Sequence, residues 1–139
     1  MEINKNLAAI DIGTNSFHLI VVKMKEDGDF EGLDAVIDKD FTASLIGRNV
    51  GADTLVIATD IQKVALDFNS DRQRDLDLIT VTEAERFLGE GHFLEGSMGP
   101  KIEASVEFLK AGGHRVIITS PDSIAQALRG EAGTTIIGG

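Results

Sequence analysis

A lysine that follows a glycine-rich loop is the first feature of this sequence with obvious chemical potential. Residues 89–110 read GEGHFLEGSMGPKIEASVEFLK, a glycine-rich loop that runs into an amphipathic helix. Pro100 suits the first helical position, which puts Lys101 in the first turn, where the helix dipole disfavours a cation. An anion at the helix start would balance this cation, because free N–H groups there attract anions. The residues alone leave a second interpretation open, a flexible loop with a solvated lysine.

A second candidate phosphate site lies near the N-terminus. The apolar runs 7–12 and 17–22 flank a polar turn and predict a β-hairpin. Asp11 interrupts the first run, which is unusual for an ionisable residue unless it is paired or faces a site. The backbone N–H groups of the turn could cradle a phosphate, although a plain polar hairpin turn has the same composition. The turn consists of Gly13, Thr14, Asn15 and Ser16.

Two further polar groups stand where elements begin or end. Asp38, Lys39 and Asp40 precede a stretch with helical spacing over residues 41–50. Lys39 could bind a phosphate between its flanking carboxylates, or Asp38 could cap the helix with Asp40 in its first turn. Thr59 and Asp60 follow the apolar run 55–58, and ligands bind beyond the carboxyl ends of strands in open α/β sheets. Ordinary loop chemistry explains this last pair equally well.

Strands and helices alternate from Ala35 onward, so we predict an α/β fold. It is a three-layer αβα arrangement with a mostly parallel sheet, preceded by the N-terminal β-hairpin. Residues 26–31 are predicted as a turn and 69–77 as a polar loop, and Thr82 with Glu85 is predicted as the capping box of a helix. The predicted strands are 35–37, 55–58, 64–66, 116–119 and 134–137, and the predicted helices are 41–50, 82–89, 100–110 and 123–128.

Composition limits the classes of function. The chain has 139 residues, enough for one domain with a real core. The formal charge of −10 argues against a general nucleic-acid or anionic-membrane surface. The absence of cysteine excludes disulfides and Cys-based zinc sites, and no apolar run reaches the length of a transmembrane helix. We therefore expect a cytoplasmic protein that binds neither nucleic acid nor membrane.

The opening AIDIGTNSFHLIVV closely resembles the first phosphate-binding hairpin of the exopolyphosphatase/guanosine-pentaphosphate phosphatase family. This resemblance covers residues 1–30. It implies that Asp11 lies beside a phosphate or a metal ion, with the following turn at the phosphate. The second glycine-rich phosphate loop of that family and its catalytic glutamate are not visible in this sequence.

Residues 32–139 resemble the C-terminal, ATP-holding half of carbamate kinase, in the amino-acid kinase family. The matching segments occur in family order and at family spacing: GLDAVIDKD, GADTLVIATD, VTEAE, EGHF followed by GSMGPKIEA, and GEAGTTII. The chain therefore resembles a join of two phosphate-handling segments between residues 26 and 33. We expect the two segments to fold into one compact domain.

The second resemblance implies specific roles. Lys39 and Lys101 would contact the phosphates of ATP and Asp40 would orient the lysines. Asp38, Thr59 and Asp60 would border the nucleotide, with Met98 and Gly99 in the adjacent loop. Mg²⁺ would accompany ATP, because phosphoryl transfer depends on positioning and charge neutralisation.

The resemblance also implies the reaction. It is a reversible phosphoryl transfer between ATP and carbamate that yields ADP and carbamoyl phosphate, in an enzyme that forms homodimers. The family's carbamate-holding half is not recognisable here, so we expect weak turnover. The alternatives are an exopolyphosphatase-like phosphate-binding protein and an inactive nucleotide-binding module.

Overall fold

The computed structural model describes residues 6–12, 17–24, 30–35, 40–93 and 97–139, and it describes side chains from Ser44 onward within these ranges. The elements follow the chain in the order β1 (Asn6–Ile12), β2 (Phe17–Met24), β3 (Phe30–Ala35), α1 (Asp40–Asn49), β4 (Thr54–Ala58), β5 (Ala65–Leu66), β6 (Arg74–Asp75), β7 (Leu78–Thr80), α2 (Val81–Gly89), α3 (Met98–Lys110), β8 (Arg115–Thr119), the 3₁₀ turn η1 (Pro121–Ser123), α4 (Ile124–Leu128) and β9 (Thr134–Ile137).

A seven-stranded sheet forms the middle layer, in the order β3-β2-β1-β4-β8-β9-β7. Its centre is β4 and β8, and four of the five residues in each of these strands are buried. Continuous apolar runs suit strands that are covered on both faces. The strands β1, β4 and β8 run parallel, and β7 runs parallel to β9.

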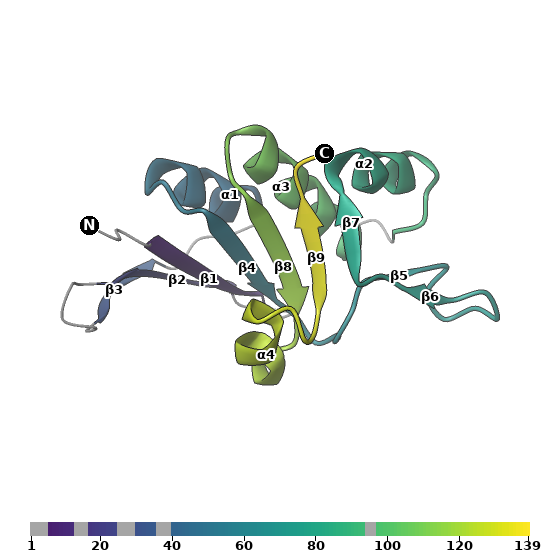
Figure 1. The fold of residues 1–139 in the computed structure, drawn as a ribbon, viewed down its shortest axis with the longest axis horizontal. Helices are drawn as coiled ribbons and strands as arrows, with labels where there is room; N and C mark the ends of the chain where they lie inside the picture. Colours follow the sequence, from purple (N-terminus) through teal and green to yellow (C-terminus); the bar gives the residue numbers. More distant parts are fainter. Residues whose placement is uncertain (1–5, 13–16, 25–29, 36–39, 94–96) are drawn as a thin grey trace.

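Helices cover both faces of this sheet (Figure 1). The helices α1, α2 and α3 lie on one face and α4 lies on the other. Alternate residues of β8 divide between the two cores: Ile118 packs under the three helices, whereas Ile117 packs against Ala127 of α4. The predicted α/β fold, with helices on both faces of a mostly parallel sheet and an N-terminal hairpin, is confirmed.

The N-terminal hairpin is part of the main sheet. β1 and β2 pair antiparallel, as predicted, with Asp11 opposite His18. β1 also pairs parallel with β4, which places Asp11 beside Ala58 in the register. A third strand, β3, extends the hairpin over part of the segment predicted as a turn, and it ends where a strand was predicted to begin.

Two local predictions need correction. The capping box of α2 is Thr80 with Glu83, two residues before the predicted pair, because the short strand β7 ends at Thr80. The predicted polar loop 69–77 contains β6, which pairs with β5 in a separate two-stranded sheet. The last strand, β9, is antiparallel to β8. Among the described residues, no helix is long and apolar enough to cross a membrane.

Candidate nucleotide site

Parallel pairing brings the ends of three strands to one edge of the sheet. Asp11 of β1 lies beside Ala58 of β4, and Ala58 lies beside Thr119 of β8. Thr59 continues this edge: its backbone N–H donates to the carbonyl of Thr119 at 2.8 Å. Thr59 is buried, and its hydroxyl donates at 3.2 Å to the Oδ1 carboxylate oxygen of Asp60, which is exposed. The edge therefore presents a fixed hydroxyl and an accessible carboxylate.

The helix α3 begins near this edge. It starts at Met98, two residues before the start that Pro100 predicted, because residues 98 and 99 already adopt helical conformation. The predicted apolar stripe of Ile102, Val106 and Leu109 is buried. Ser97, the N-cap residue, makes no side-chain capping bond, so its hydroxyl leaves the first N–H groups of the helix uncapped.

Lys101 is buried, with only 8% of its surface exposed. Its ammonium donates to the Ser97 carbonyl at 3.4 Å, and no carboxylate of a described residue lies within 4 Å of it. The interpretation of Lys101 as a solvated loop lysine is therefore wrong. A buried ammonium is costly unless an anion balances it, so the start of α3 is a suitable place for a phosphate.

Other lysines of this region are already paired. Lys63, in the segment after β4, donates to Asp77, and Lys110 at the far end of α3 pairs with Glu85. The hydrogen bond to Asp77, reinforced by coulombic attraction, raises the pKa of Lys63 above its ordinary value. Lys63 therefore carries a charge that Asp77 balances, in contrast to Lys101.

A small pocket of about 60 Å³ joins the strand edge to the start of α3. Ile61, two residues beyond Thr59, lines it together with Ser97 and Met98, so the two predicted site segments meet here. Most of the lining is apolar, which suits the base of a nucleotide better than its phosphates. The remaining lining residues are Ala65, Phe68, His92 and Phe93.

These last four residues were missed by the sequence interpretation. His92 and Phe93 stand in the quoted EGHF segment, so their nearness to the GSMG loop was an available signal. Ala65 and Phe68 had no such signal, because they come from the β5–β6 hairpin (residues 65–75), whose position depends on tertiary packing.

Two buried hydroxyls also lie at this edge. The Oγ1 atom of Thr119 and the Oγ atom of Ser120 have no hydrogen-bond partner among the described residues. Gly133 packs against Thr119 with a φ of +72°, and a Cβ atom there would lie 2.9 Å from the backbone oxygen of Ile118. Glycine is therefore required where the chain turns into β9.

The side chains of the other predicted site residues lie outside the described part of the structure. Gly13, Thr14, Asn15, Ser16, Asp38 and Lys39 lie outside the described residues. The backbones of Asp11 and Asp40 are described, in β1 and at the first residue of α1, but their side chains are not. The described side chains contain no group of three or more His, Asp or Glu residues that could hold a metal ion.

Comparison with known proteins defines the class. Residues 15–120 match the Amino acid kinase family, so this chain belongs to that family. The match begins within the segment that resembles the phosphatase hairpin.

The relatives are more specific. Carbamate kinase-like protein YahI of Escherichia coli (strain K12) is 48% identical over 118 residues, which are 85% of this chain and 37% of YahI. Carbamate kinase of Halobacterium salinarum is 44% identical over 117 residues, or 84% of this chain and 38% of that enzyme. The structure of carbamate kinase from Giardia lamblia bound to AMP-PNP superposes with a TM-score of 0.71 at 38% identity, covering 85% of this chain and 41% of that one. The chain thus spans well under half the length of these relatives.

Proposed function

We propose that this chain is the ATP-binding portion of a carbamate-kinase-like phosphotransferase. The observation that carries the proposal is Lys101, a buried ammonium that no described carboxylate balances, at the uncapped start of α3. The Giardia relative, which shares this fold at 38% identity, holds the ATP analogue AMP-PNP. Nucleotide phosphate is the anion that would balance Lys101 here.

The proposed site divides the nucleotide between two environments. The phosphates lie against Lys101 and the first N–H groups of α3, including that of the buried Gly99. The base occupies the apolar pocket beside Met98. Thr59 and Asp60 border the nucleotide from the end of β4.

Mg²⁺ fits this site as a companion of the phosphates. It commonly binds through one or two carboxylates plus substrate phosphate oxygens, without a dedicated protein cage. Asp60 is exposed and would supply one such carboxylate. Asp11, whose backbone lies one position before the same sheet edge, is our second proposed ligand.

The remaining roles rest on the resemblance to carbamate kinase. Lys39 is proposed as the second phosphate-binding cation, with Asp40 orienting the lysines and Asp38 bordering the nucleotide. Phosphoryl transfer needs these charges held in place more than it needs covalent catalysis. The reaction is the reversible transfer between ATP and carbamate, and ADP and carbamoyl phosphate are the ligands of the reverse direction.

Nucleotide binding is the direct test. Calorimetric titration of the 139-residue chain with ATP and with AMP-PNP, each in the presence of Mg²⁺, is expected to show one site. Inorganic phosphate at the same concentration is the control, because it can bind at Lys101 but cannot fill the apolar pocket. Absence of nucleotide binding would overturn the proposal.

Turnover is a separate question. We expect little or no ATP formation from ADP and carbamoyl phosphate by this chain alone, because substrate positioning can be worth ~7–11 kcal/mol of the barrier and the segments that hold carbamate in the family are not recognisable. A coupled assay of ATP formation measures this. Rapid turnover by the chain would show that its own residues hold both substrates.

The phosphatase-like reading is the second candidate, and one observation favours it. β1, the strand that carries Asp11, ends at the same sheet edge as β4 and β8. Release of phosphate from polyphosphate is its test, with Asp11→Asn as the variant. Binding of nucleotide without either activity would identify the third candidate, an inactive nucleotide-binding module.

A further inference from the structure

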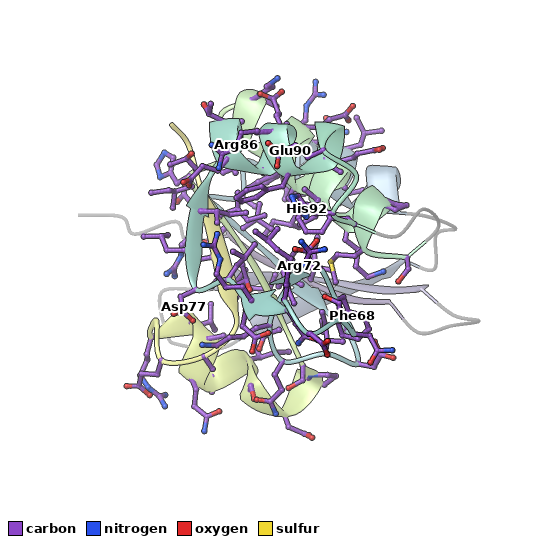
Figure 2. All side chains as sticks on the ribbon, turned by 90° about the vertical axis from the view of Figure 1, so that its right-hand side faces the viewer. Phe68, Arg72, Asp77, Arg86, Glu90 and His92 are labelled. Carbon is purple, nitrogen blue, oxygen red and sulfur yellow. The ribbon has the colours of Figure 1, made fainter. Side chains whose placement is uncertain are left out.

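His92 connects two segments that are far apart in the sequence. Its Nδ1 atom lies 3.1 Å from Oδ1 of Asp67, which belongs to the β5–β6 hairpin. Its Nε2 atom lies 3.0 Å from Oε2 of Glu90, the C-cap residue of α2. Figure 2 shows His92 between Glu90 above and Phe68 of the hairpin below. Both ring nitrogens therefore face carboxylates, one from each segment.

A histidine ring has two nitrogen atoms, and each can take part in a hydrogen bond. In His92 both nitrogens lie within hydrogen-bond distance of a carboxylate oxygen, one from the hairpin and one from α2. The ring therefore links the two segments directly.

Arg86 also lies near this bridge. Its Nε atom lies 3.8 Å from Oε1 of Glu90, so it uses the oxygen that His92 leaves free. The Arg86 guanidinium also lies 4.9 Å from the centre of the Phe87 ring, and that ring meets the His92 ring edge to face at 5.7 Å. Arg86 therefore fixes Glu90 and Phe87, the two α2 neighbours of His92, without replacing its bond.

Some hydrogen bonds join residues within the β5–β6 hairpin, and others attach it to the rest of the molecule. Within it, the Ser70 hydroxyl donates to the Asp67 carbonyl at 2.7 Å, and the side chain of Gln73 accepts from the Asn69 N–H at 2.9 Å. At its base, the buried Thr134 hydroxyl accepts from the Val64 N–H at 2.8 Å and donates to the Leu76 carbonyl at 2.6 Å. His92 supplies the second attachment, away from the base.

The bridge joins the two walls of the pocket. Ala65 and Phe68 line it from the hairpin, and Phe93 and Met98 line it from the segment after α2. The hairpin projects beyond β7 at the side of the sheet (Figure 1), so the main sheet does not cover it there. The width of the pocket then depends on how the hairpin is held against α2.

We propose that His92 is a positioning residue that, through its two ring nitrogens, fastens the β5–β6 hairpin to α2 and so holds the nucleotide pocket at its binding width. The link to nucleotide rests on the proposed function above, whereas the fastening itself does not.

The test measures two quantities separately: the protection of the hairpin against hydrogen exchange and the affinity for nucleotide. Amide hydrogen exchange of residues 65–75, corrected for intrinsic rates, is compared for wild type and His92→Gln, with His114→Gln as the matched control. The side chain of His114 is 76% exposed, and its Nδ1 atom lies 3.8 Å from Oδ1 of Asp53. Losing two partly exposed contacts with carboxylates should reduce the protection of the hairpin amides against exchange by about threefold to tenfold in His92→Gln. The control should show no change. Equal protection in all three proteins would overturn the fastening.

AMP-PNP affinity tests the link to the pocket. His92→Gln should weaken it about threefold to tenfold, in step with the loss of hairpin protection. If protection falls and affinity does not, His92 fastens the hairpin but does not position the nucleotide site. If wild type binds no nucleotide, the proposed function fails, and the exchange measurements alone decide the fastening.

Discussion

Replacing Lys101 with methionine separates its charge from its packing. The residue exposes only 8% of its surface, so its aliphatic stem is part of the packed start of α3. Methionine keeps an unbranched chain of similar volume and deletes only the ammonium. Alanine deletes the ammonium and most of the stem. Comparing the two variants therefore distinguishes a role of Lys101 in binding from a role in stabilising the fold.

The structure sets the expected magnitudes. Lys101→Ala removes about three buried methylenes, at ~0.8 kcal/mol each, so unfolding should become easier by about 2–3 kcal/mol. Lys101→Met should change stability by less than about 1.5 kcal/mol, because the ammonium has one long hydrogen bond to lose. In ATP binding both variants lose a charge-assisted bond to phosphate worth about 1.5–3 kcal/mol, or roughly tenfold to a hundredfold in affinity.

Urea denaturation without ligand and calorimetric titration with ATP and Mg²⁺ measure the two effects. Lys110→Met is the matched control, since Lys110 lies on the same helix with 57% of its side chain exposed and pairs with Glu85. The control should bind ATP like wild type. If Lys101→Met also binds like wild type, the phosphate assignment is wrong. If it unfolds instead, Lys101 is structural and the buried ammonium has a protein partner.

Three further predictions concern single substitutions. Gly133→Ala should destabilise by about 2–4 kcal/mol in urea denaturation, because of its φ of +72° and the 2.9 Å approach to backbone; Gly138→Ala, with nothing within 4 Å, should be neutral. Thr134→Val leaves two buried backbone groups without their partner and should cost roughly 2–4 kcal/mol, whereas Thr135→Val on the same strand should cost little. Lys39→Ala should weaken ATP binding about tenfold to a hundredfold with an unchanged melting temperature, and equal affinity would remove Lys39 from the proposed site.

The sequence predicts most elements of this fold because their signals are local. The buried strands β4 and β8 appear as short apolar runs bounded by polar residues, and the buried stripe of α3 appears at helical spacing. The capping box of α2 shows the limit of such signals. The segment Thr80-Val81-Thr82-Glu83-Ala84-Glu85 contains the required spacing twice, and only the end of β7 selects Thr80.

Features of the site that depend on tertiary packing could not be predicted in this way. Lys101 reads as a first-turn surface lysine, because nothing local shows that its stem is covered. The bridge from His92 to Asp67 spans 25 residues and depends on where the β5–β6 hairpin lies. That position in turn depends on the Thr134 hydroxyl, which meets Val64 across 70 residues. Neither contact leaves a periodic pattern in the sequence.

The pairing of the N-terminal hairpin with the main sheet has a structural explanation that does not depend on its resemblance to a phosphatase. β4 is buried at the centre of the sheet and needs a hydrogen-bonded neighbour on each side; β8 supplies one and β1 supplies the other. β2 and β3 then extend the sheet away from β4. Because β1 is parallel to β4, completing the sheet in this way also brings Asp11 beside Ala58, one residue before Thr59. The N-terminal hairpin and the strands β4 and β8 therefore share a single sheet edge.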